Sequence, residues 1–249
     1  MEPPLATVDK AIDVLFALHA AEVSLGVTAL SRALCLPKSS AHRLLAALRR
    51  RGLVEQDERG RYRLGIGLIA LGLGVLEREP AVAAARPIIE QEAESLGETF
   101  FLVAARGGQL VVLDKAEGTG FLRAAPRVGA VVPVHATAVG KLQLALAPSE
   151  LEFAIAPSEA FTGATHTSET AIRREVELAR ERGWAANVDE WIAGLSVLAA
   201  PVVHRGRLLA HVALAVPSAR ASELGLGALA ERVCKTAERI VQRLAGDMP

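Results

Sequence analysis

Two short helical patterns joined by a turn at Cys35-Leu36-Pro37 dominate the first quarter of the chain. The first begins near Thr28, which is a candidate cap, and stops before Pro37, because proline disfavours helical backbone in the residue that precedes it. The second runs from about Lys38 to Arg50 and repeats apolar residues on one face at helical spacing: Ala41, Leu44, Leu45 and Leu48. Two short helices across a tight turn are typical of a helix-turn-helix, whose second helix enters the major groove of DNA.

A further helix is predicted before this pair, and a β-hairpin after it. Thr7 is a candidate cap for a helix with inward-facing apolar residues at helical spacing: Val8, Ile12, Leu15 and Leu18. Residues 53–55 and 62–64 have strand character on either side of Asp57-Glu58-Arg59-Gly60, where glycine supplies the turn conformation. The hairpin completes the pattern of a winged helix-turn-helix.

Positive charge gathers on this region although the whole chain is neutral, with 28 basic and 28 acidic residues. Between Arg32 and Arg63 there are nine lysine and arginine residues against three acidic ones, a local excess of six positive charges. Contacts to DNA phosphates require such a surface. The sequence therefore predicts DNA contacts from the outward face of the second helix of the pair and from the wing: Lys38, Ser39, Ser40, His42, Arg43, Arg49, Arg50, Arg61 and Arg63.

The stretch from Gly65 to Leu76 contains no charged residue. A helix here would be apolar on nearly every side, and such a helix must be buried. The stretch is well short of the roughly 20 residues that cross a bilayer. We therefore expect a linker helix that packs against a partner subunit, with glycines that permit close backbone approach.

The rest of the chain combines hairpins with helices. Residues 100–105 and 110–116 flank one glycine-containing turn, and residues 195–203 and 208–216 flank another. Helical patterns begin at Pro87, at Ser168 with a stop at Gly183, and at about Ser222. Because hairpins build antiparallel sheets, the sequence predicts an α+β domain.

No pattern in the chain predicts an enzyme. Cys35 and Cys234 are far apart, so neither a disulfide framework nor a structural zinc site is expected. The histidines show no recognised metal spacing, Gly140-Lys141 lacks the rest of a phosphate-binding loop, and no Gly-x-Ser-x-Gly nucleophile elbow occurs. The first residues have no basic head followed by an apolar run. We expect a cytoplasmic protein without membrane attachment, catalytic residues, metal or cofactor.

Several further runs, in order along nearly the full length, carry a family pattern. They are Val8–Leu15, Leu36–Leu45, Gly60–Gly65, Gly97–Thr99, Val128-Gly129, Pro133–Lys141, Gly183-Trp184 through Asp189-Glu190 to Gly194, and Ala199–Pro201. Together they resemble the isocitrate lyase regulator (IclR) family of bacterial transcription factors. The resemblance implies a winged helix-turn-helix DNA-binding domain over residues 1–65, a linker helix over 66–85, and a GAF-like effector-binding domain with an antiparallel sheet over 86–249.

The resemblance also implies partners and a pocket. A homodimer formed through the N-terminal part, with dimers often pairing through the effector domain, would bind a near-palindromic double-stranded operator. A small-molecule effector would shift the two DNA-binding domains of the dimer relative to each other. For Asp189 and Glu190 a binding or structural role is favoured over acid–base work. The implied effector-binding residues are Phe121, Ala124, Val132, Ala138, Val139, Gly140, Asn187, Asp189, Leu195, Val197, Ala213 and Ala215.

The chain departs from the family pattern inside this implied pocket. Many relatives carry Ser-x-Ser-Gly-Pro where this chain has Ala213–Pro217, and often cysteine or serine in place of Val197. Burying a small carboxylate without hydrogen-bond partners would cost several kcal/mol. We therefore expect a larger, more apolar effector, such as an aromatic or acyl compound. The alternative function is a ligand sensor or enzyme whose N-terminal region serves only for dimerisation.

Overall fold

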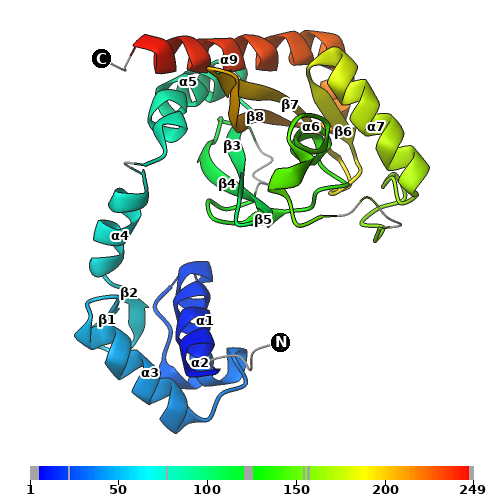
Figure 1. The fold of residues 1–249 in the computed structure, drawn as a ribbon. Coiled ribbons are helices and arrows are strands. Elements are labelled where there is room, and N and C mark those ends of the chain that lie inside the picture. Colours follow the sequence, from blue (N-terminus) through cyan, green and yellow to red (C-terminus); the bar gives the residue numbers. More distant parts are fainter. Residues whose placement is uncertain are drawn as a thin grey trace. The chain divides into compact units, whose positions relative to one another are not determined.

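The computed structural model describes residues 6–21, 23–76, 78–120, 126–153, 155 and 158–246. The chain divides into two compact units, Met1–Arg78 and Glu79–Pro249 (Figure 1). Among the described residues, no helix is both long and apolar enough to cross a membrane.

The N-terminal unit has the predicted winged helix-turn-helix. Its elements are α1 (Ala6–Ala20), α2 (Val27–Ala33), α3 (Lys38–Arg50), β1 (Val54–Gln56), β2 (Tyr62–Leu64) and α4 (Gly67–Leu76). The strands β1 and β2 pair in antiparallel fashion, and Leu25 extends the wing through two backbone hydrogen bonds with Tyr62, of 2.9 and 2.8 Å. One core joins the three helices to the wing: Val14, Leu18, Leu30, Leu45, Leu48, Val54 and Tyr62.

Three local predictions in this unit were wrong. The helix α2 is capped by Gly26 rather than Thr28, and Thr7 lies inside α1 rather than before it. Val8 and Ile12 were expected to face inward but are 52% and 45% exposed, whereas Val14 and Leu18 are buried. Because α1 is apolar on more than one face, periodicity alone did not select the face that packs on α3.

The C-terminal unit is the predicted α+β domain. Its six strands are arranged in the order β5-β4-β3-β8-β7-β6, and every neighbouring pair is antiparallel. The helices are α5 (Pro80–Leu96), α6 (Ala138–Leu146), η1 (Pro148–Glu150), α7 (Glu169–Arg182), α8 (Ser218–Leu224) and α9 (Leu226–Gly246). The strands are β3 (Thr99–Arg106), β4 (Gln109–Ala116), β5 (Val131–Val132), β6 (Ala185–Val188), β7 (Leu195–His204) and β8 (Arg207–Pro217).

The sheet is covered on both faces. Helices α5 and α9 pack together along one face, and α6 and α7 contribute to the core on the other (Figure 1). Side chains alternate between the faces along each strand, so Phe100 and Leu102 enter the first core while Phe101 and Val103 enter the second. Strands β3, β7 and β8 are therefore apolar on both sides.

Two helix starts differ from prediction. The helix expected from Pro87 begins at Pro80 and contains Pro87 in its interior. Proline removes one helical hydrogen bond, at a cost of about 3 kcal/mol, but Pro87 and Ala83 are exposed, so water can satisfy the freed Ala83 carbonyl. The last helix was expected from Ser222, but α8 ends at Gly225, whose positive φ of 82° lets the chain turn before α9 begins at Leu226.

A buried histidine lies on β8. The Nε2 atom of His211 is 2.9 Å from Gln143 Oε1, while Gln143 Nε2 donates to Ala147 O and Glu150 Oε2. Since Gln143 Oε1 must accept, His211 Nε2 carries the proton and Nδ1 is left as a buried atom without a partner. Burial lowers the pKa of His211 to about 3 from the usual 6.5.

We predict that His211 makes the C-terminal unit sensitive to acid. Between pH about 6.5 and about 3 the unfolded chain binds one proton more than the folded chain, so the free energy of unfolding decreases as the pH falls. At pH 5 the loss from this residue is about 2 kcal/mol. His211→Gln keeps a donor for Gln143 but does not titrate in this range.

Urea unfolding followed by tryptophan fluorescence tests this, since both tryptophans, Trp184 and Trp191, lie in the C-terminal unit. The wild type should lose more stability between pH 7 and pH 5 than His211→Gln, and comparing the two cancels the contribution of carboxylates. Equal losses would contradict the prediction.

Candidate nucleic-acid interface and effector pocket

The outward face of α3 carries the polar residues that the sequence predicts to contact DNA. Its buried face consists of Ala41, Leu45 and Leu48. At 3.6 residues per turn, Ser39, Arg43 and Arg50 lie near the middle of the opposite face. The exposed predicted residues on α3 are Lys38, Ser39, His42, Arg43, Arg49 and Arg50, and Ser40 is half-buried.

The turn before α3 is fixed by the chain itself. Cys35 adopts the left-handed region, with φ of 50°, and Ser31 Oγ donates a 2.6 Å hydrogen bond to Leu36 O. The Leu36 N–H donates to Ser31 O at 2.9 Å. These contacts set the angle between α2 and α3, and so the direction in which the basic face points.

The wing is tied to α3 by a side-chain relay. Arg49 donates from Nη1 to Gln56 Oε1 at 2.8 Å, and Gln56 Nε2 donates to Gly60 O at 3.2 Å. At the wing tip, Asp57 Oδ1 accepts from the backbone N–H of Arg59 and of Arg61, and the Arg61 contact is the main reason that the pKa of Asp57 is lowered. Arg61 itself is exposed.

A second relay joins the wing to α4. Glu55 Oε2 pairs with Arg63 at 3.2 Å, while Glu55 Oε1 accepts a 3.1 Å hydrogen bond from the N–H of Ile66, just before α4. The Ile66 contact is the largest cause of the lowered pKa of Glu55. Glycine is required here, because a Cβ at Gly65 would lie 2.3 Å from Gly52 O. Thus α4 is anchored on the wing.

The helix α4 exposes most of its apolar side chains within the single chain. Five of them are more than half exposed: Ile66 before the helix, then Ile69, Leu71, Leu73 and Val75. Exposed apolar patches of this kind mark protein–protein contacts. Val8, Ile12 and Phe16 form a further exposed stripe on α1.

In the C-terminal unit, most of the described residues predicted for the effector line one cavity of about 40 Å³. They are Val132, Val139, Asn187, Leu195, Val197, Ala213 and Ala215. The register explains this, because Ala213 and Ala215 on β8 pair with Ala199 and Val197 on β7, and Val197 pairs with Asn187. The cavity also includes Pro126, which lies in the segment 121–132 that the family resemblance implies for the pocket, and Phe101, Val103, Thr137 and Trp191, which were not predicted.

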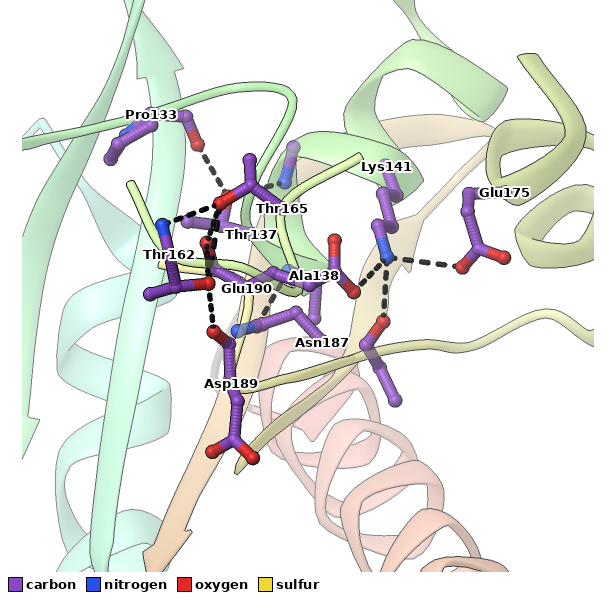
Figure 2. Close-up of polar contacts among 12 residues, drawn as sticks. Pro133, Thr137, Ala138, Lys141, Thr162, Thr165, Glu175, Asn187, Asp189 and Glu190 are labelled. Atoms are coloured by element: carbon purple, nitrogen blue, oxygen red, sulfur yellow. Dashed lines mark hydrogen bonds and ion pairs between the residues drawn. The ribbon is translucent and has the colours of Figure 1, made fainter. Parts of the chain in front are cut away.

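Two of the described residues that line the cavity, Thr137 and Asn187, place polar groups near the start of α6. Thr137 caps α6, accepting from Gly140 N at 3.1 Å and donating to Pro133 O at 2.6 Å (Figure 2). Asn187 Oδ1 accepts from Ala138 N at 3.1 Å, which leaves its NH₂ group as a donor. None of the described lining residues carries a charge. The cavity can therefore hold an apolar body with a polar group near the start of α6.

Other predicted residues support the cavity without lining it. Ala138 and Gly140 are buried in α6, and a Cβ at Gly140 would lie 1.8 Å from Val134 O. Asp189, with φ of 58°, accepts from Gly194 N at 2.8 Å and Ser218 Oγ at 2.6 Å, so it shapes the turn after β6. Phe121 and Ala124 lie outside the described residues.

A buried ion-pair network lies beside the cavity. The ammonium group of Lys141, 1% exposed, donates to Glu190 Oε1 at 2.6 Å, Glu175 Oε2 at 3.0 Å and Ala186 O at 3.1 Å (Figure 2). It thereby joins α6, α7, β6 and the turn that follows β6. Sequence reasoning missed this role because a lysine in α6 carries no local sign of burial.

Two protein-family models match this chain. Residues 7–58 match the model of the IclR helix-turn-helix domain, and residues 73–242 match that of the bacterial transcriptional regulator IclR C-terminal domain. The chain belongs to the IclR family. It is a DNA-binding transcriptional regulator whose operator binding is modulated by a small-molecule effector.

Similar proteins extend over nearly the whole chain. The HTH-type transcriptional regulator XynR of Escherichia coli K12 is 30% identical over 236 residues, covering 93% of this chain and 94% of XynR. The crystal structure of Thermotoga maritima IclR matches with a TM-score of 0.78 and 26% identity, covering 96% of this chain and 99% of that one.

A third match shows the same fold with a ligand. It is an IclR homologue from Microbacterium hydrocarbonoxydans complexed with 4-hydroxybenzoate. The TM-score is 0.80 at 21% identity, covering 97% of this chain and all of that chain. These matches confirm the predicted fold class, with an N-terminal helix-turn-helix and a C-terminal antiparallel sheet packed with helices.

Proposed function

We propose that this IclR-family regulator binds a near-palindromic operator as a homodimer, with α3 in the major groove. The exposed basic face of α3, continued by the wing, supports this proposal. Arg43, Arg50 and Ser39 lie at the centre of that face and are assigned to bases and nearby phosphates. Lys38, Ser40, His42, Arg49, Arg61 and Arg63 are assigned to phosphates and to holding the wing in place.

The homodimer is proposed to form through α4. An almost wholly apolar helix is unfavourable in water, and its four exposed apolar side chains, with Ile66 just before it, offer a self-complementary surface for the same helix of a second copy. In domain terms, residues 1–65 would read DNA and residues 66–78 would link and pair the subunits. Residues 79–249 would bind the effector, because the residues expected to end the linker, 80–85, begin α5 and belong to the core of the C-terminal unit. Dimers of dimers would then form through the effector domains.

The effector is proposed to be an aromatic or acyl compound with one polar group. The described cavity walls are mostly apolar, and near the start of α6 the Asn187 NH₂ group is left to donate a hydrogen bond. The residues assigned to it include Phe121 and Ala124 besides those that line the cavity. The 4-hydroxybenzoate complex of a family member has a ligand of this class.

The small volume of the cavity connects effector binding with a change in the structure of the domain. A benzene-sized ligand occupies a cavity of about 150 Å³, whereas the cavity here measures about 40 Å³. An aromatic effector must therefore displace lining side chains, and Trp191 and Pro126, which lie outside strands and helices, can move most easily. Effector binding would then favour a second arrangement of the domain and change operator affinity. We propose this regulatory role, rather than catalysis, for the cytoplasm, where bacterial DNA lies.

We predict that Arg43→Ala weakens operator binding by roughly 1–3 kcal/mol, because a bidentate contact to a base edge contributes that much. Genomic pull-down identifies the operator, and fluorescence anisotropy measures the affinity. Arg174→Ala is the control, since Arg174 is exposed on α7 in the other unit. An unchanged affinity for Arg43→Ala would remove the assignment.

For the dimer, Leu71→Glu combined with Val75→Glu should yield monomers in sedimentation velocity, because charges would be buried in the paired helices. The operator affinity should fall as well, since one head then contacts one half-site. Leu224→Glu, at an apolar position 41% exposed on α8, is the matched control. A double variant that remains dimeric would disprove pairing through α4.

For the effector, calorimetry should show no micromolar binding of pyruvate or glyoxylate to the wild type, whereas 4-hydroxybenzoate serves as the aromatic probe. Ala213→Ser with Ala215→Ser adds hydroxyls to the cavity wall. A hydrogen bond to a charged group contributes about 1.5–3 kcal/mol, so the variant should bind the small acids at least about 10-fold more tightly. Micromolar binding of either small acid to the wild type would overturn the apolar assignment.

A further inference from the structure

Three side chains that could bind a metal meet at the Lys141 network, to which two of them belong, outside the residues that line the effector cavity. They are His166, Glu175 and Glu190, and one potential ligand atom from each lies within 4.8 Å of the other two. They come from the loop before α7, from α7 itself and from the turn after β6. With Trp184 they line a hollow of about 260 Å³.

Two carboxylates and two cations meet at this hollow, because Arg182 lines it as well as the glutamates that pair with Lys141. Lys141 takes Glu190 Oε1 and Glu175 Oε2, so one ammonium group faces two carboxylates. The Glu190 side chain is only 6% exposed, and its second oxygen, Oε2, is buried without a hydrogen-bond partner. A buried carboxylate oxygen without a partner is unfavourable by about 1–3 kcal/mol or more. The site therefore offers a buried carboxylate oxygen that is free to act as a ligand atom.

We propose that His166, Glu175 and Glu190 bind a divalent transition-metal ion, with zinc the best fit. One imidazole nitrogen and two carboxylate oxygens are typical zinc ligands, and three protein ligands with one water complete a tetrahedron. The hollow provides access for that water. Tetrahedral zinc ligands lie about 3.4 Å apart, so the ligand atoms must close in slightly. His166 lies in a loop and Glu175 is 26% exposed, so both can adjust.

The chain holds the ligands near each other without a metal. Thr162 Oγ1 donates to Asp189 O at 2.6 Å, and Thr165 Oγ1 donates to Glu190 O at 2.5 Å (Figure 2). These bonds fasten the loop that carries His166 to the turn that carries Glu190. Preorganised ligands lose less conformational entropy on binding.

Lys141 positions both carboxylates rather than binding the metal. By holding one oxygen of each glutamate, it leaves the other oxygen of each for the ion, as hydrogen-bonded partners of metal ligands commonly do. Its positive charge weakens binding, so affinity in the micromolar range is expected. A bound ion would fasten the loop and α7 to the end of β6, where Asn187 forms the wall of the effector cavity.

Calorimetric titration of ZnCl₂ into the full chain, freed of metal with EDTA, tests the site. The wild type should bind one zinc per chain, and His166→Ala and Glu175→Gln should each weaken binding at least about 100-fold, beyond the 10–100-fold typical of a lost supporting partner. CoCl₂ should give visible absorption bands of a tetrahedral site, and MgCl₂ should bind at least about 10-fold more weakly because of the nitrogen ligand.

Matched controls separate this site from binding elsewhere. His204→Ala, Glu177→Gln and Cys35→Ser with Cys234→Ser should all retain wild-type zinc affinity. Thermal unfolding in EDTA shows whether each variant is folded. Absence of zinc binding to the wild type, binding that survives both His166→Ala and Glu175→Gln, or binding lost in the cysteine variant would each overturn the proposal.

Discussion

The buried ammonium group of Lys141 holds together the parts of the chain that surround the proposed effector cavity. Its three acceptors come from α7, from β6 and from the turn after β6, while its own backbone belongs to α6. Removing one partner of a buried ion pair leaves an uncompensated charge, which is unfavourable by about 3–5 kcal/mol. The placement of Thr137, Val139 and Asn187 at the cavity depends on this cross-link, since all three lie on the elements that it joins.

In the N-terminal unit, hydrogen bonds at the surface orient the elements, rather than a buried charge. Its core is small, and the direction of α3 is set by short polar contacts: Ser31 with Leu36 at the turn, Arg49 with Gln56 toward the wing, and Glu55 with Ile66 toward α4. Arginines that appeared equivalent in the sequence thus differ in role. Arg49 and Arg63 have partners within the protein, whereas Arg43 contacts only Ser40, at 3.5 Å, among the described residues.

Features with strong local signals were predictable from the sequence. The bounds of α3, the capping of α7 by Ser168 and Gly183, and both hairpins of the main sheet follow from periodicity, capping and turn chemistry. Phe101 and Val103 could also have been assigned to the cavity, because they alternate with Phe100 and Leu102 along β3.

Features that depend on tertiary packing were not predictable. The exposure of Val8 and Ile12 depends on which face of α1 meets α3, and the start of α5 at Pro80 depends on burial of the alanines before Pro87. His166, Glu175 and Glu190 come together only because β6 and α7 pack beside α6, and their spacing in the sequence matches no motif.

Gly65 and Gly67 lie in close contact with Gly52, so the start of α4 packs directly on the winged helix-turn-helix. In the proposed dimer, a rotation of α4 about its axis would carry α3 with it, so the way the linkers pair would set the separation of the two half-sites that the dimer binds. Chimeric regulators built from two family members should therefore be joined after α4. A junction at residue 65 would take Glu55 from one parent protein and Ile66 from the other. The transplanted winged helix-turn-helix would then be uncoupled from the effector-binding domain.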